Sequence, residues 1–107
     1  MKRTKSCLMA LALVTAAVAS PVPRSLAADA MAGKEIYEEH CERCHGEDGR
    51  GNVAGAPDFT RGTGLMAPDA EIARVLRTGR GAMPAYEGFL RQQQLLDVIA
   101  YMRGLQR

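Results

Sequence analysis

Apolar residues recur at helical spacing in three stretches of the chain, and each stretch predicts a helix. The first helix is expected over about residues 30–44, and the residues along one side of it are Gly33, Tyr37, Cys41 and Cys44. No stretch alternates between apolar and polar residues in the way that predicts a strand. The pattern therefore favours an all-α fold.

The other two helices are expected in the C-terminal half of the chain. The second begins near Asp69, whose carboxylate is of the N-cap type, and it ends at Gly79. Its apolar face consists of Ile72, Val75 and Leu76. The third is expected over about residues 91–105, and its buried face consists of Leu95, Val98, Ile99, Met102 and Leu105. Loops rich in Gly and Pro, residues 46–67 and 79–90, connect the three helices.

The N-terminus has the features of a secretory signal peptide. Three basic residues before position 6 precede an apolar run over residues 8–19, and small residues surround Ala27. The run is too short to cross a bilayer. We therefore expect residues 1–27 to be removed, with the cleavage site within a few residues of Ala27. That leaves a secreted domain over residues 28–107, without stable membrane insertion. The alternative is a short membrane anchor that is not cleaved.

The domain that remains after cleavage has little apolar material of its own. It has five aromatic residues and no Trp, and a chain of this size has difficulty burying enough surface unaided. A buried prosthetic group would supply the missing apolar surface. Without the signal peptide, ten Arg and Lys stand against twelve Asp and Glu, a formal charge of −2. Nothing in this balance or in the motifs indicates nucleic-acid binding.

The most specific motif in the chain is Cys41-Glu42-Arg43-Cys44-His45. This CXXCH spacing lets both thiols form thioethers with the two vinyl groups at one edge of a porphyrin, with the imidazole of His45 under the iron. A bare CXXC also fits a redox dithiol or half of a zinc site. A redox dithiol would need a βαβ context. A zinc site would need two more ligands, and the remaining cysteine, Cys7, lies in the predicted signal peptide.

Together with other motifs, the CXXCH segment makes the chain from Gly33 onward resemble the class I cytochrome c family of small electron-carrying haem proteins. The segments that carry the resemblance are Gly33 and Tyr37, Cys41–Gly46, Gly49–Gly51, Ala56–Phe59, Gly81–Tyr86 and Val98–Arg103. The resemblance implies a cytochrome c fold, in which three main helices and Gly- and Pro-rich loops surround one covalently bound haem c. It also implies that Gly33 lets the first and last helices cross closely, with Tyr37 and Tyr101 packed beside the crossing.

The resemblance further implies the residues that bind the haem iron. Cys41 and Cys44 would attach the haem, His45 would be the proximal ligand, and Met83 stands at the position of the sixth ligand. Pro84 supports this position, because it biases the preceding residue toward an extended conformation in a Gly-containing loop. Met66 in the other loop is the alternative, as is a site without a sixth ligand.

Two more residues near the motif have open roles. In the resembled family, a proline after the motif accepts a hydrogen bond from the proximal imidazole through its carbonyl, and Pro57 is the candidate here. An ordinary turn proline is an equal alternative. His40 is expected to be a solvated residue on the first helix and is a minor candidate as an iron ligand.

These observations predict a periplasmic monohaem c-type cytochrome that carries one electron at a time and is not an enzyme. Its partners would be redox proteins, such as a dehydrogenase, a cytochrome complex or an oxidase, and it would be a monomer or a subunit. A dedicated subunit of one dehydrogenase or oxidase would use the same haem residues. A haem enzyme such as a peroxidase would need an open distal site, which Met83 should fill. Acids are concentrated before Gly49 and Arg after it, which indicates either two solvated faces or a dipole that steers a partner.

Overall fold

The computed structural model describes residues 27–107, so the predicted signal peptide lies outside the described residues except for Ala27. The described chain forms four α-helices and one 3-10 turn: α1 (Ala30–His40), α2 (Glu42–His45), η1 (Phe59–Arg61), α3 (Asp69–Thr78) and α4 (Gln92–Gly104). Within residues 27–107 the only β-type pairing is an isolated bridge between Arg80 and Met83. The predicted all-α fold is confirmed. No helix in this range is both long and apolar enough to cross a bilayer.

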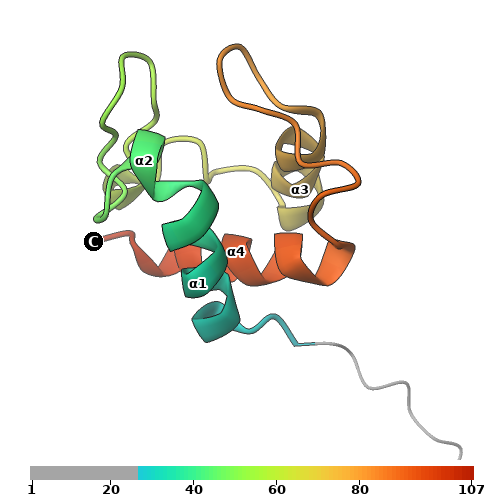
Figure 1. The fold of residues 1–107 in the computed structure, drawn as a ribbon. Coiled ribbons are helices and arrows are strands. Elements are labelled where there is room, and N and C mark those ends of the chain that lie inside the picture. The colour runs from blue at the N-terminus through green and yellow to red at the C-terminus, as the bar shows by residue number, and fades with distance from the viewer. Residues whose placement is uncertain (1–26) are drawn as a thin grey trace, which may run out of the picture.

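Figure 1 shows α1 crossing α4, with α2 and α3 standing apart from each other on the same side of α4. At the crossing, a β-carbon built on Gly33 would overlap the carbonyl of Asp97 in α4. The rings of Tyr37 and Tyr101 pack beside it, with centroids 5.2 Å apart. The close crossing at Gly33, with two tyrosines beside it, is therefore confirmed.

The start of α1 is also bonded to α4 by polar contacts. The Asp29 carboxylate caps α1 by accepting from the amides of Met31 and Ala32, at 2.9 and 3.2 Å. The Asp29 amide in turn donates to Oδ1 of Asp97 at 2.8 Å. Asp97 is buried, and Nε2 of Gln93 donates to the same oxygen at 2.8 Å. The buried Asp97 carboxylate thus joins the start of α1 to α4, and it has the hydrogen-bond donors that a buried polar group needs.

The predicted first helix is divided in two. We expected it to run to Cys44, but α1 ends at His40 and α2 begins at Glu42. The amide of Cys44 donates to the carbonyl of Cys41 at 3.2 Å, and not to that of His40 as a continuous helix would require. The break therefore leaves the His40 carbonyl outside the helical hydrogen bonds.

The role expected for Asp69 is also corrected. The N-cap of α3 is Pro68, and Asp69 is the first helical residue. The Asp69 carboxylate instead accepts from Nε and Nη2 of Arg103, at 2.8 and 2.6 Å. The same guanidinium donates to the carbonyls of Leu65 and Ala67 at 2.9 Å each. Asp69 thus fixes the last turn of α4 to the segment that leads into α3.

The core follows the predicted helical faces. In α4, Leu95, Val98, Ile99 and Met102 are buried as expected, whereas Leu105 is only partly buried. In α3, Ile72, Ala73 and Leu76 are buried, and Val75 on the same apolar face is partly buried. Tyr37 from α1, Cys41 from the break after it, and Phe59 and Leu65 from the long loop complete the buried hydrophobic set of the described residues.

Candidate functional site

The segments that carry the predicted haem residues enclose a cavity of about 1100 Å³. Cys41, Cys44, His45 and Met83 all line this cavity, so the structure brings together the four side chains that the sequence singled out. Sites for small molecules in proteins usually measure roughly 300–1,000 Å³. The cavity is therefore large enough for a large prosthetic group.

The two cysteines at the cavity differ in exposure. Cys41 is buried, whereas Cys44 is exposed. Burial, with a smaller contribution from Cys44, raises the pKa of the Cys41 thiol to about 11. A redox dithiol is expected in a βαβ context, and within residues 27–107 the only β-type pairing is the isolated bridge between Arg80 and Met83. The described fold therefore argues against the redox-dithiol interpretation of the CXXC motif.

The imidazole of His45 lies against the wall of the cavity. Its ring stacks on Phe59, with centroids 4.8 Å apart and planes inclined by 19°. Burial lowers the pKa of His45, which favours the neutral form that binds metals. Its Nδ1 atom is buried and has no hydrogen-bond partner among the described residues. A neutral, oriented imidazole fits an iron ligand.

The bond that was implied for Pro57 is not formed. Pro57 lines the cavity, but Nδ1 of His45 has no hydrogen-bond partner within residues 27–107, so the Pro57 carbonyl does not accept from it. Pro57 instead packs where a β-carbon on Gly64 would contact it, at 3.3 Å. This arrangement supports the alternative, a proline that shapes a Gly-rich loop.

Met83 lies in a loop that is held by backbone hydrogen bonds. Its amide donates to the carbonyl of Arg80 at 2.9 Å, and the Arg80 amide donates to the Met83 carbonyl at 3.1 Å. The turn requires glycine at position 79, because φ there is +73° and a β-carbon would lie 2.7 Å from the Met83 carbonyl oxygen. Met83 is half-buried against the core. Met66 also lines the cavity, but 86% of it is exposed.

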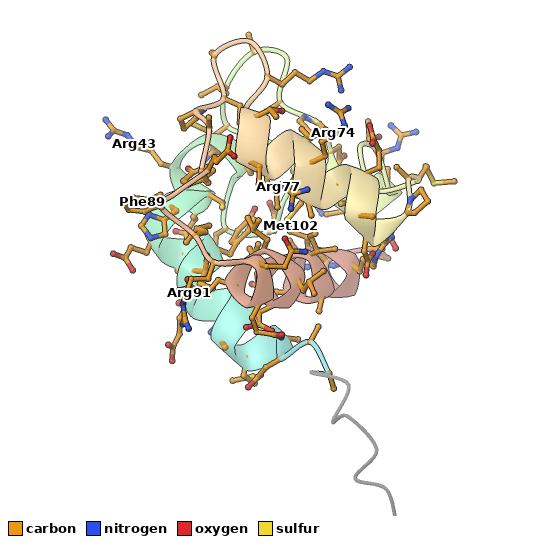
Figure 2. The ribbon with its side chains drawn as sticks, turned by 90° about the vertical axis from the view of Figure 1, so that its right-hand side faces the viewer. Arg43, Arg74, Arg77, Phe89, Arg91 and Met102 are labelled. Carbon is orange, nitrogen blue, oxygen red and sulfur yellow. The ribbon has the colours of Figure 1, made fainter. Side chains whose placement is uncertain are left out.

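The expectation that His40 is solvated is wrong. Its side chain is only 21% exposed and lines the cavity. Its ring meets that of Phe89 edge-on, with centroids 5.1 Å apart, and lies 6.1 Å from the ring of Tyr86. We call His40, Tyr86 and Phe89 the rim cluster. Phe89 is 65% exposed, and Figure 2 shows it between Arg43 and Arg91 at the edge of the molecule. No pattern in the sequence predicted the cluster, since His40 lies 46 positions before Tyr86 in the chain.

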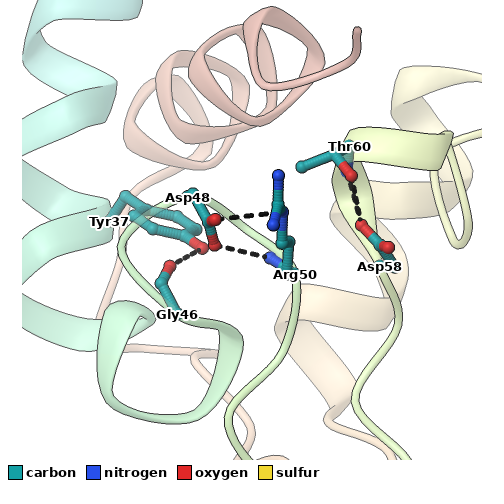
Figure 3. Close-up of polar contacts among 6 residues, drawn as sticks. All are labelled: Tyr37, Gly46, Asp48, Arg50, Asp58 and Thr60. Atoms are coloured by element: carbon teal, nitrogen blue, oxygen red, sulfur yellow. Dashed lines mark hydrogen bonds and ion pairs between the residues drawn. The ribbon is translucent and has the colours of Figure 1, made fainter.

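Local hydrogen bonds fix the loop that follows the CXXCH motif (Figure 3). The buried hydroxyl of Tyr37 donates to the carbonyl of Gly46 at 2.6 Å, and burial raises the pKa of this tyrosine. Further along, the hydroxyl and amide of Thr60 donate to the Asp58 carboxylate at 2.6 and 3.0 Å. These hydrogen bonds lower the pKa of Asp58. The residue after His45 is thus anchored on α1.

Comparison with known proteins gives consistent similarities. Residues 28–102 match the family model described as cytochrome C oxidase, cbb3-type, subunit III. The chain is 36% identical over 101 residues to cytochrome c6 of Nostoc sp. strain PCC 7120, an alignment that covers 91% of this chain and 86% of that protein. It is 36% identical over 89 residues to the cbb3-type cytochrome c oxidase subunit FixP of Bradyrhizobium sp. strain ORS 278. That alignment covers 80% of this chain but 31% of FixP, so the chain spans about a third of this relative.

A solved structure shares the fold. Cytochrome c6 from the diatom Phaeodactylum tricornutum superposes with a TM-score of 0.59 at 24% identity, covering 71% of this chain and 92% of that one. The helices of the described residues are thus arranged as in a cytochrome c6.

Proposed function

This chain belongs to the class I c-type cytochrome family, and we propose that Cys41 and Cys44 attach its haem c while His45 and Met83 ligate the iron. Membership of the family makes the chain an electron-transfer cytochrome with covalently bound haem c. The assignment of individual residues is supported by one observation above all. The two thiols, the imidazole and the thioether line one cavity of about 1100 Å³.

In this proposal the two cysteines share one task, and His45 and Met83 have one task each. When bound, the haem supplies an iron that changes between the ferric and ferrous states and so carries one electron. The cysteines prevent the cofactor from dissociating. The ring of Phe59 fixes the orientation of His45 by stacking on it. The thioether of Met83 is a soft, neutral donor that favours ferrous iron and raises the potential.

The attachment can be tested by extraction with acidified acetone. We expect wild-type haem to remain with the polypeptide, because thioether bonds survive this treatment. In a variant with both Cys41→Ala and Cys44→Ala, any haem that is bound should pass into the acetone. The matched control is Met83→Ala, which alters an iron ligand but leaves both thiols, and it should retain haem. Extraction of haem from the wild-type protein would refute the attachment.

We further propose that the mature protein begins near Ala28 and acts in the periplasm as a freely diffusing electron carrier. The signal-like sequence supports export, and the similarity to cytochrome c6 over most of both chains supports a small carrier. N-terminal sequencing of the haem-containing protein from a periplasmic extract tests both parts. A protein that retains residues 1–27 in the membrane fraction would contradict them.

A second candidate is a dedicated subunit of one dehydrogenase or oxidase. The observation that favours it is the match of residues 28–102 to the subunit III family of cbb3-type oxidases. The two candidates predict different behaviour during purification under mild conditions. A free carrier should elute as a monomer, whereas a subunit should co-elute with a larger redox enzyme and lose its electron donor when separated from it.

A further inference from the structure

Tyr86 makes hydrogen bonds to three separate elements. Its amide donates to the carbonyl of Leu76 in α3 at 2.9 Å. Its carbonyl accepts from the amides of Phe89 and Leu90 at 3.0 Å each, in the turn that leads into α4. Its hydroxyl donates to the carbonyl of His40, the last residue of α1, at 2.9 Å. A residue three positions after Met83 is therefore bonded to elements from both halves of the domain.

The acceptor of the hydroxyl bond is a carbonyl that helix formation leaves free. Because the chain breaks between α1 and α2, the Cys44 amide donates to Cys41 and leaves the His40 carbonyl without its helical donor. A carbonyl at a helix end needs another partner when it is partly buried. The Tyr86 hydroxyl is that partner, and it approaches the peptide directly before the first attachment cysteine.

This bond joins the two sides of the haem cavity. On one side, residues 41–45 carry both thiols and the imidazole, and on the other side, the loop over residues 79–90 carries Met83. The rings of the rim cluster pack over the same junction. Burial raises the pKa of the Tyr86 hydroxyl, so the group remains a protonated donor at neutral pH. The bond is thus available whenever the loop is closed over the cavity.

We propose that Tyr86 is a positioning residue whose hydroxyl holds the Met83 loop closed and so limits the exchange of the sixth iron ligand. The inference rests on the proposed function, since it takes Met83 as that ligand. An external ligand can bind the ferric iron only after Met83 has left and the loop has opened. A hydrogen bond that exists only in the closed state shifts the equilibrium between closed and open loop toward the closed state. The apparent affinity for the external ligand falls by the same factor, because the ligand binds only the open state.

The test is a titration of the ferric holoprotein with imidazole, followed in the visible spectrum. Tyr86→Phe removes the hydroxyl and keeps the ring. A neutral hydrogen bond of ordinary strength predicts that imidazole binds the variant roughly two- to tenfold more tightly than wild type. The matched control is Tyr101→Phe, which removes a hydroxyl from the tilted pair of tyrosine rings at the helix crossing and should leave imidazole binding unchanged.

Amide hydrogen exchange provides a second measurement that a merely structural role would not reproduce. In Tyr86→Phe, exchange should become faster at the amides of Met83, Tyr86 and Glu87, while the α4 amides of Val98 and Ile99 keep their protection. Equal imidazole affinity and equal loop exchange in variant and wild type would overturn the proposal. If the wild-type spectrum lacks the sulfur-to-iron band, the assignment of Met83 fails instead, and the exchange rates still decide whether Tyr86 holds the loop.

Discussion

The carbonyl of Asp97 occupies the position that a β-carbon on Gly33 would need. The distance between α1 and α4 is therefore set by contact of one helix backbone with the other. A glycine inside a helix costs roughly 1 kcal/mol relative to alanine. The close contact of α1 with α4, and the burial of Tyr37 beside it, offset that cost.

Gly33→Ala should separate the two helices and lower the free energy of unfolding. Overpacking of this kind costs roughly 1–3 kcal/mol. The added carbon would clash with the backbone carbonyl of Asp97, which cannot rotate away as a side chain could. The matched control is Gly104→Ala in the last turn of α4, where no atom of residues 27–107 outside its own surroundings lies within 4 Å of the added carbon. This control should be neutral or stabilise by up to about 1 kcal/mol. Denaturant unfolding of both holoproteins measures the difference, and equal stability of the two variants would contradict the crossing argument.

Met83→Ala should abolish the weak near-infrared band from sulfur to ferric iron and lower the reduction potential, because the soft donor is lost. Met66→Ala should change neither, although Met66 lines the same cavity. The reason is their difference in burial. Met83 is half-buried on a hydrogen-bonded loop, whereas Met66 is 86% exposed. Spectra and potentiometric titration of both variants provide the comparison. Loss of the band in the Met66 variant alone would reverse the assignment.

Most of this site could be predicted because its signals are local in the sequence. The CXXCH motif places both thiols and the imidazole within five residues, and Pro84 marks the conformation of its neighbour. The burial of His40 could not be predicted, since it depends on Phe89 in a distant loop. The same holds for Asp69, whose carboxylate is taken by Arg103 from α4. The signal peptide and the first residue of the mature protein remain predictions.

The alkaline behaviour should reflect the position of the one lysine outside the predicted signal peptide. A neutral lysine amine can replace methionine on ferric iron at high pH. Lys34 lies on α1 and its Nζ pairs with Glu38 at 3.2 Å, which raises the pKa of Lys34 above the ordinary value for lysine. The amine therefore becomes neutral only at higher pH than an ordinary lysine. We expect Lys34→Ala to leave the alkaline transition nearly unchanged.

Electron paramagnetic resonance during alkaline titration tests the expectation for Lys34. As a positive control, Ala82→Lys puts an amine on the exposed loop next to Met83 and should produce a low-spin amine-ligated species at lower pH. Such a species in the wild-type protein that disappears in Lys34→Ala would show that the prediction is wrong.

Tyr37→Phe should destabilise the loop after the haem motif. The variant leaves the buried Gly46 carbonyl without its donor, a loss of roughly 1–3 kcal/mol. Burial raises the pKa of Tyr37 in the folded state. The hydroxyl therefore contributes fully to the free energy of unfolding below pH 10.0, the ordinary pKa of tyrosine, and this contribution is lost as the pH rises from there toward the folded pKa. Unfolding experiments at neutral and alkaline pH should therefore show a difference between variant and wild type that shrinks with rising pH. A difference that stays constant would contradict the role of this hydroxyl.

Expression without haem attachment should give a chain that lacks a cooperative unfolding transition. A cavity of about 1100 Å³ borders Ile72, Leu76 and Met102 of the core. When such a cavity is unfilled, the side chains around it lack packing contacts, and the loss of stability grows with the cavity volume. An 80-residue domain has little surplus stability to compensate. Calorimetry and circular dichroism of the haem-free protein would check this. A sharp thermal transition with the helix content of the holoprotein would refute it.

The contacts between α1 and α4 also govern the order of events during biosynthesis. The bond from Asp29 to Asp97 connects residues 68 positions apart, so the first helix meets its partner only when nearly the whole polypeptide has been made. Closing so long a loop loses conformational entropy, and this loss comes before the favourable contacts at the Gly33 crossing can form and offset it. A nascent chain therefore cannot form this crossing until α4, residues 92–104, has left the ribosome. During that interval both thiols of the haem motif remain accessible to whatever enzyme modifies them.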